Sequence, residues 1–360
     1  MRVAVDGRAL RPGATHQRGV ARYLRCLLEA LAQAAPEDEY AVVVAGGREP
    51  EPFGAWGVRL VRSRVPGRVL FGAAALSRRP RLDRLVGGCD VAWAPAVAPL
   101  AVSPGIPLVL TLHDLSFEHA ADFSRYERIW HRLARPRELA RRADRVICPS
   151  AAVRDAAAAW GVPPERLRVV RSGPGRPRPA EADAGSPAGV AAPYVLAVGA
   201  LEPRKLPDVL AEAHRIARSR GLQAGLVFAG DGPLRRELAG SQSVVLGHVP
   251  DPALEALYDG ALAVACVSRD EGFGFTPIEA LARGVPPIVA DLPVFGETLG
   301  EGALRVPPGD AKALADALLR LEREPGLRER LVAAGREAVA GLSWERAARE
   351  TRAVLAEAAA

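Results

Sequence analysis

The chain has 360 residues, more than a single hydrophobic core usually supports, so its length indicates two domains. Its 49% hydrophobic and 25% charged residues are typical of a well-packed globular protein and exclude an extensively disordered chain. The net charge of +6 is unevenly spread: residues 1–180 hold 29 Lys and Arg against 17 Asp and Glu, and the remainder hold 19 against 25. We therefore expect the first half to meet an anionic partner, such as a nucleic acid, a membrane surface or a phosphorylated acceptor.

The four cysteines lie apart from one another, without a CxxC pair or a histidine at metal-ligand spacing. This pattern predicts free, buried thiols in a reducing compartment. The first ten residues, MRVAVDGRAL, are typical of a strand and lack the apolar core of a signal peptide. Because no run approaches the roughly 18 apolar residues of a membrane span, we expect a cytoplasmic protein.

Short apolar runs alternate with helix-length segments along the chain, which predicts parallel sheets covered by helices on both faces. In the first half we expect helices over 19–34 and 125–143, and strands over 3–7, 40–46, 58–63, 91–95, 108–114 and 145–150. In the second half we expect a helix from residue 207 and strands over 194–199, 225–230, 244–247, 263–268 and 285–290. A last helix over 343–358 would begin at a serine cap.

The segment 173–192 is dense in Pro, Gly and Ala and reads as a linker between the two halves. We therefore expect a Rossmann-like domain over 1–172 and a second one over 193–342. The terminal helix, 343–360, is a candidate to pack back on the first domain. Because open α/β sheets bind ligands at the carboxyl ends of their strands, two such domains facing each other would form an interdomain cleft.

Two adjacent cations, Arg204 and Lys205, fall between a strand that ends at Gly199 and the following helix. Cations in this position, beside a helix N-terminus, predict a diphosphate site. The alternative is a solvated pair of surface cations. The turn Gly-Asp-Gly-Pro at 230–233 predicts an ordinary α/β connection, and no strand is followed by the GxGxxG fingerprint of dinucleotide binding.

The stretch DEGFGFTPIEALARGVP, residues 270–286, sets two glutamates eight residues apart. Gly272 and Gly274 would leave backbone N–H groups open to a ligand. We expect a helix to begin near Pro277, with Glu279 in its first turn and Glu271 in the loop above. Carboxylates accept hydrogen bonds from vicinal diols, so the pair could hold two sugar rings. The alternative is that Glu279 only stabilises the helix N-terminus.

The segment EGFGFTPIEALARGVPPIVAD resembles the E-x7-E signature of retaining glycosyltransferases of family 4, whose fold is the GT-B type with two Rossmann-like domains. VGALEPRKLPDVLAEA, TLHDLSFEH and the N-terminal MRVAVDGRAL also resemble that family, so the likeness extends over nearly the whole chain. The resemblance implies transfer of a hexosyl unit from a nucleotide-diphosphate sugar to a saccharide or lipid-linked saccharide, without a metal. The N-terminal half resembles mannosyltransferases of polysaccharide assembly, and this resemblance favours GDP-mannose as the donor.

The resemblance also implies roles for individual residues. Glu271 would contact the hydroxyls of the donor sugar, and Glu279 the ribose diol. Arg204 and Lys205 would neutralise the leaving diphosphate. The remaining residues that the resemblance places near the donor are His113, Gly19, Gly272, Phe273, Gly274, Phe275 and Thr276, with His113 near the reaction centre and Gly19 on a loop near the diphosphate. No residue is assigned as a metal ligand.

Several features leave alternatives open. Arg18 stands where many relatives have Gly or Thr, and Asp6 and Asp114 could face the cleft or merely cap loops. Segments 58–85 and 125–145 carry eight arginines each, interleaved with apolar residues. They could contact anionic lipid or form solvated surfaces, and no nucleic-acid-binding motif accompanies them. A nucleotide-sugar 2-epimerase and a non-catalytic nucleotide-sugar-binding scaffold remain rival functions.

Overall fold

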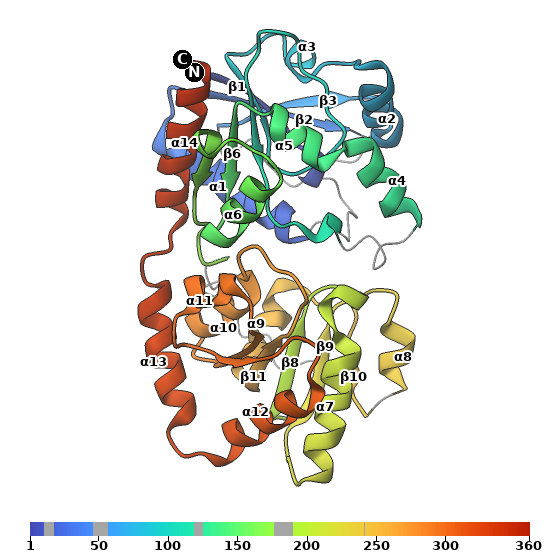
Figure 1. Cartoon of the computed structure of the whole chain (residues 1–360), viewed down its shortest axis with the longest axis vertical. Coiled ribbons are helices and arrows are strands. Elements are labelled where there is room, and N and C mark those ends of the chain that lie inside the picture. Colours follow the sequence, from blue (N-terminus) through green and yellow to red (C-terminus); the bar gives the residue numbers. More distant parts are fainter. Residues whose placement is uncertain (11–17, 46–56, 119–124, 176–189, 241) are drawn as a thin grey trace. The chain divides into compact units, whose positions relative to one another are not determined.

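The computed structural model describes residues 1–10, 18–45, 57–118, 125–175, 190–240 and 242–360. The chain forms two compact units, and each is described by itself (Figure 1). The first comprises Met1–Gly175 together with Leu342–Ala360, and the second comprises Arg176–Gly341. Each unit is built on a parallel sheet with helices against it, as the alternating apolar runs predict.

The first unit's sheet has the strand order β3-β2-β1-β4-β5-β6-β7 over the described residues, and every pair is parallel. Its strands are β1 (Arg2–Asp6), β2 (Glu39–Ala45), β3 (Arg59–Ser63), β4 (Val91–Ala94), β5 (Leu108–Thr111), β6 (Arg145–Cys148) and β7 (Leu167–Val169). The six expected strands all form. Strand β7 was not predicted, because three residues are too few to show a pattern.

The helices of the first unit are α1 (Arg18–Ala34), α2 (Gly67–Ser77), α3 (Leu82–Leu85), α4 (Arg125–Ala134), α5 (Pro136–Arg142), α6 (Ala151–Ala159) and α14 (Trp344–Ala359), with 3₁₀ turns η1 (Arg8–Leu10), η4 (Ser116–Glu118) and η6 (Pro164–Arg166). The expectation of one helix over 125–143 is wrong. Arg135 takes a left-handed conformation, with φ of 48°, and divides the segment into α4 and α5. Pro136 causes the break, because a proline disfavours helical geometry in the residue before it.

The last helix, α14, belongs to the first unit and packs against α1 and against strands β4, β5 and β6. Ser343 caps it by accepting a hydrogen bond from the backbone N–H of Arg346 at 3.1 Å. The indole N–H of Trp344 donates to the carbonyl of Gly175 at 2.7 Å. The start of the last helix is thereby joined to the last described residue before the second unit.

The second unit's sheet has the order β10-β9-β8-β11-β12-β13, again with all pairs parallel. Its strands are β8 (Tyr194–Val198), β9 (Gly225–Ala229), β10 (Val244–Val245), β11 (Ala261–Cys266), β12 (Pro287–Ala290) and β13 (Leu304–Val306). Its helices are α7 (Pro207–Ser219), α8 (Arg235–Ala239), α9 (Asp251–Asp259), α10 (Phe275–Ala282), α11 (Pro293–Leu299), α12 (Ala311–Arg323) and α13 (Leu327–Val339), with the 3₁₀ turn η7 (Pro203–Lys205). The strand order reverses direction between β8 and β11, and such a switch point is where sheets of this kind bind ligands.

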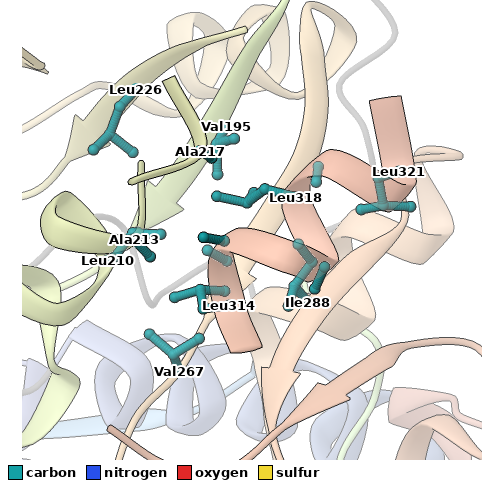
Figure 2. Packing of buried hydrophobic residues seen from close by; sticks show 14 of the residues in the cluster. Val195, Leu210, Ala213, Ala217, Leu226, Val267, Ile288, Leu314, Leu318 and Leu321 are labelled. Carbon is teal, nitrogen blue, oxygen red and sulfur yellow. The ribbon is translucent and has the colours of Figure 1, made fainter. Parts of the chain in front are cut away.

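The core of the second unit covers both faces of its sheet. Figure 2 shows one face, where Val195 of β8 lies among Leu210 of α7 and Leu314 and Leu318 of α12. The neighbouring residue Tyr194 belongs to a separate buried cluster on the other face. Strands buried on both faces are apolar at successive positions, which is why they were recognisable in the sequence. Among the described helices, none is long and apolar enough to cross a membrane.

Candidate functional site

The clearest cluster of charged side chains lies at the carboxyl ends of β8 and β11. Lys205 ends the turn η7 that follows β8, and Glu271 lies in the loop that follows β11. The ammonium of Lys205 forms an ion pair with Oε1 of Glu271, and the two side chains are 25% and 15% exposed. The structure thus brings two of the predicted site residues into direct contact across the switch point.

Glu271 has two further partners that the sequence did not reveal. The hydroxyl of Ser268 donates to its Oε1 atom at 3.0 Å, and the thiol of Cys266 lies 3.8 Å from the same oxygen. Burial, reinforced by the negative charge of Glu271, raises the pKa of Cys266 to about 12. The thiol is therefore protonated at neutral pH and able to donate. Both residues lie in the apolar run AVACVS, where they looked like ordinary strand positions.

Arg204 pairs with a different carboxylate from the one that Lys205 contacts. Its Nε atom donates to Glu202 at 3.2 Å, and both side chains are largely buried. Its backbone carbonyl accepts from the N–H of Arg269 at 2.9 Å, which joins the loops after β8 and β11. Each of the two adjacent cations is thus paired with a glutamate, and an anionic ligand would have to compete with those carboxylates.

Glycines fix the backbone of the loop that carries these cations. A Cβ atom at Gly230 would lie 1.7 Å from the carbonyl oxygen of Gly199, and one at Gly232 would lie 2.5 Å from that of Leu201. The N–H of Leu201 donates to the carbonyl of Asp231 at 3.0 Å. The turn at 230–233 therefore braces the cation loop, in addition to connecting β9 with α8.

Glu279 lies in the second turn of α10, so the expectation of a first-turn position is wrong. The helix begins at Phe275 because Gly274, with φ of +85°, caps it. Pro277 fits inside the first turn, where a missing N–H costs nothing. Glu279 is only 4% exposed and accepts a hydrogen bond from the hydroxyl of Tyr258 at 3.3 Å. The stabilisation of a helix N-terminus falls off beyond the first turn, so that alternative does not account for this buried carboxylate.

The segment between the two glutamates is tightly packed. The rings of Phe273 and Phe275 meet edge to face with centroids 5.2 Å apart. Gly272 is buried, and a Cβ at Gly274 would lie 2.7 Å from the ring of Phe295. Thr276 lines a pocket of about 40 Å³ together with Lys205, and this volume has room for little more than water. A larger ligand would rest over these residues instead of entering the pocket.

His113 belongs to the first unit and follows β5. Its Nε2 atom lies 2.8 Å from the carbonyl oxygen of Pro95, and the ring of Tyr23 meets it edge-on at 4.6 Å. Burial lowers the pKa of His113, while the Pro95 carbonyl and the charge of Asp114 partly oppose that shift. Because a carbonyl only accepts, the neutral imidazole donates from Nε2.

The other predicted positions of the first unit are a helical glycine and two carboxylates with structural roles. Gly19 was expected on a loop, but it is the second residue of α1, and a Cβ there would meet no atom of the described residues within 4 Å. Asp6 forms a buried ion pair with Arg8 at 2.6 Å. Asp114 accepts from the N–H and hydroxyl of Ser116, so it caps its loop. Over the described ranges, no three His, Cys, Asp or Glu residues gather in a way that could hold a metal ion.

Two family models match the chain one after the other. The model described as Glycosyltransferase Family 4 matches residues 17–173, and the model described as Glycosyl transferases group 1 matches residues 181–338. The chain belongs to the glycosyltransferases of this two-domain type. The predicted relation to the family 4 glycosyltransferases is thereby confirmed.

Known proteins resemble the chain in sequence and in fold. The phosphatidyl-myo-inositol mannosyltransferase of Mycobacterium leprae is 38% identical over 152 residues, 40% of each chain. The chain aligns with 20–46% of the length of such curated relatives. Sucrose-phosphate synthase from Thermosynechococcus elongatus is 21% identical, with a TM-score of 0.72 over 99% of this chain and 98% of that one. HepE from Anabaena, in complex with UDP and glucose, is 20% identical, with a TM-score of 0.67 over 99% of both chains. These likenesses confirm the expected GT-B fold.

Proposed function

We propose that the chain transfers a hexosyl unit from a nucleotide-diphosphate sugar to a saccharide or lipid-linked saccharide. The observation that carries this proposal is the Lys205–Glu271 pair at the switch point of the second sheet. It sets a cation and a carboxylate side by side where sheets of this kind bind ligands. The HepE complex with UDP and glucose, and the mannosyltransferase among the relatives, support a nucleotide sugar as donor and a mannosyl unit as its sugar.

The reaction breaks the bond between the anomeric carbon and the diphosphate, which leaves negative charge on the diphosphate oxygens. Lys205 and Arg204 would stabilise that charge. A diphosphate would draw the ammonium of Lys205 away from Glu271. The carboxylate of Glu271 would then accept hydrogen bonds from sugar hydroxyls. The binding of one part of the donor would thus prepare the residue that holds the other part, and no metal is needed in this scheme.

Two further groups, the carboxylate of Glu279 and the imidazole of His113, complete the proposal. Glu279 would bind the ribose diol and share its carboxylate with the hydroxyl of Tyr258. His113, neutral at pH 7, would act near the reaction centre as a hydrogen-bonding group and not as a cation. Since we assign no side chain as a nucleophile, retention of configuration would come from attack on the face that the diphosphate leaves.

We also propose that helices α2 and α4 bring the protein to an anionic membrane on the cytoplasmic side. Among the described residues, the large hydrophobic side chains that remain exposed are Val65, Val69, Leu76 and Ile129, at 41–79% exposure. They lie on or beside these two helices, which pack together amid the basic segments. Leu76→Asp should weaken co-sedimentation with phosphatidylglycerol vesicles. Unchanged co-sedimentation would contradict the role of this surface.

The chain offers an internal reference for testing the donor site, because Lys205 and Lys312 are its two lysines. Amine acylation quantified by mass spectrometry can follow both, with GDP, UDP, ADP or TDP present and with or without Mg²⁺. We expect one nucleoside diphosphate to protect Lys205 about tenfold without Mg²⁺, while exposed Lys312 keeps its reactivity. If no nucleotide reduced the labelling of Lys205 below its level without nucleotide, the proposed donor site would be contradicted.

A turnover assay separates the rival functions. A transferase should release nucleoside diphosphate only as a glycosylated acceptor forms, with the anomeric configuration of the donor preserved. A 2-epimerase would release nucleotide without an added acceptor. A scaffold would protect Lys205 in the acylation assay and turn over no donor. The last two results would each overturn the proposed transfer.

A further inference from the structure

A separate pocket lies on the first unit, at the junction of α4 and α5. Its volume is about 420 Å³, within the range of small-molecule sites. The lining residues come from η4, α4, α5 and the end of α6: Phe117, Glu118, His131, Arg132, Arg135, Pro136, Arg137, Glu138, Arg141 and Trp160. None of them belongs to the proposed donor site.

The break between the two helices directs arginines from both of them to this pocket. Helix α4 ends with a hydrogen bond from the N–H of Arg135 to the carbonyl of His131 at 2.9 Å. The left-handed Arg135 then reverses the backbone, and Pro136 begins α5. An unbroken helix would spread the same arginines around its circumference. The bend instead lets Arg132 of α4 and Arg141 of α5 line one cavity.

The wall of the pocket is held by specific contacts. The indole N–H of Trp160 donates to Oε1 of Glu118 at 2.6 Å, and Arg137 forms an ion pair with the same oxygen. The guanidinium of Arg137 also lies over the Trp160 ring, 5.5 Å from its centroid. Two further lining residues, Phe117 and His131, meet edge to face with ring centroids 4.7 Å apart. The pocket is therefore preorganised and partly aromatic.

The positive charges of the pocket exceed its carboxylates. Glu118 pairs with Arg137, and Glu138 pairs with Arg135 at 3.1 Å. Arg132 and Arg141 also line the pocket, and neither forms an ion pair with any residue that the structure describes. Two guanidinium groups are thus available to one ligand. Guanidinium matches the paired oxygens of phosphate, which it binds through two parallel hydrogen bonds.

We propose that the α4–α5 pocket binds a phosphate or diphosphate group, with Arg132 and Arg141 as its main ligands. Phe117, Pro136 and Trp160 would border the uncharged part of the same molecule. The group could belong to a phosphorylated saccharide in solution or to a phospholipid headgroup. This inference concerns binding alone, so it stands or falls independently of the proposed transfer.

The test uses inorganic pyrophosphate and isothermal titration calorimetry on the full chain. The donor cations are first removed with Arg204→Ala/Lys205→Ala, so that any remaining binding reports on the pocket. We expect pyrophosphate to bind this variant. The further change Arg132→Ala/Arg141→Ala should raise the Kd about tenfold or more, as expected for the loss of charged hydrogen bonds. A matched control, Arg84→Ala/Arg346→Ala, removes two exposed arginines of the same unit that do not line the pocket.

The outcomes are distinct. Absence of binding to the donor-site variant would overturn the proposal, and so would equal Kd values with and without Arg132 and Arg141, or an equal loss in the control. Glucuronate binding as tightly as pyrophosphate would overturn the assignment to phosphate. Thermal unfolding of each variant, with an unchanged midpoint, shows that the fold is retained.

Two competition arms identify the source of the phosphate. Displacement of pyrophosphate by glucose 1-phosphate, but not by vesicles, would support a soluble phosphorylated saccharide. Displacement by phosphatidylcholine vesicles that contain phosphatidic acid, but not by phosphatidylcholine alone, would support a lipid headgroup.

Discussion

Each unit of the molecule contains a histidine whose Nε2 atom lies against a backbone carbonyl. His113 in the first unit donates to Pro95 at 2.8 Å, and His214 in the second lies 3.0 Å from the oxygen of Ala224. Burial lowers the pKa of both imidazoles. His113 nevertheless follows a strand at the carboxyl edge of its sheet, whereas His214 lies in the middle of α7 and is 4% exposed.

The comparison shows that a perturbed pKa does not identify a functional residue by itself. A pKa lowered by burial and a hydrogen bond to a backbone carbonyl occur once in a helix that packs on a sheet and once at a strand end. Position in the fold separates them, because ligands of such sheets bind at the carboxyl ends of strands. The second unit shows the same contrast between His214 and the carboxyl edge of its sheet. At that edge Lys205 and Glu271 form an ion pair, and a ligand could separate their opposite charges.

The largest expected effect is on Lys205. Lys205→Ala should lower kcat/KM by about 10²–10³-fold, the usual result of removing one group that stabilises transition-state charge. Steady-state assays with saturating acceptor would measure it. Lys312→Ala, at the only other lysine, serves as the control and should leave the rate unchanged. A wild-type rate for Lys205→Ala would place the chemistry elsewhere.

The two histidines should respond to substitution in opposite ways. His113→Ala should lower kcat by about 10²-fold, as misplaced groups near a reaction centre do, with little change in KM. His214→Ala should instead lower the free energy of unfolding by about 2–3 kcal/mol, since it leaves a cavity and an unpaired carbonyl. Urea unfolding and turnover of both variants decide the matter. A large loss of kcat from His214→Ala, or no loss from His113→Ala, would contradict the assignment of a functional role to His113 and a structural role to His214.

A smaller effect should appear in the dependence of stability on pH. Both histidines have a folded-state pKa below 6.5, the ordinary value for a histidine. The stability they contribute is therefore complete above about pH 6.5 and is lost as the pH falls toward the folded value. Thermal midpoints from pH 8 to pH 5 should decline for the wild type. The decline should be shallower for each single histidine variant, and identical slopes would show that neither imidazole is held neutral.

The smallest effect concerns Asp38, at 1% side-chain exposure, which connects the first strand with the last helix. Burial favours its neutral form, but Arg352 at 2.7 Å and the N-terminal ammonium at 2.9 Å outweigh burial and lower the pKa of Asp38. Its contribution is full above the unfolded value near 3.8 and is lost as the pH falls below it. Asp38→Asn should therefore lower the midpoint at pH 7, and its difference from the wild type should shrink as the pH falls below 3.8. A difference that stays constant as the pH falls from 7 to well below 3.8 would exclude this role.

The sequence predicted most of the fold because the strands are buried on both faces. Runs such as YVLAVG are apolar at successive positions, and these were identified. Strands β7 and β13, of three residues each, carry too little signal. The start of α10 was misplaced because Pro277 suggested the first helical residue. The helix is instead capped by Gly274, three residues before Pro277, so it begins at Phe275.

The site was predicted in composition but not in contacts. Lys205 and Glu271 are 66 residues apart, and only the parallel pairing of β8 with β11 brings their loops together. The contact of Gly230 with Gly199 likewise depends on the pairing of β8 with β9. A local pattern identifies a residue that could bind a ligand, but it cannot tell which other loop lies opposite.

The position of α14 has a consequence for biosynthesis. The first unit contains both ends of the chain, and residues 176–341 of the second unit are inserted between its two parts. During synthesis from the N-terminus, the first sheet and α1 emerge long before the helix that packs against them. The second unit is a continuous segment and can complete its core earlier. We expect a released chain that ends at residue 341 to contain a folded second unit, joined to a first unit that still exposes the apolar surface that α14 covers in the full chain.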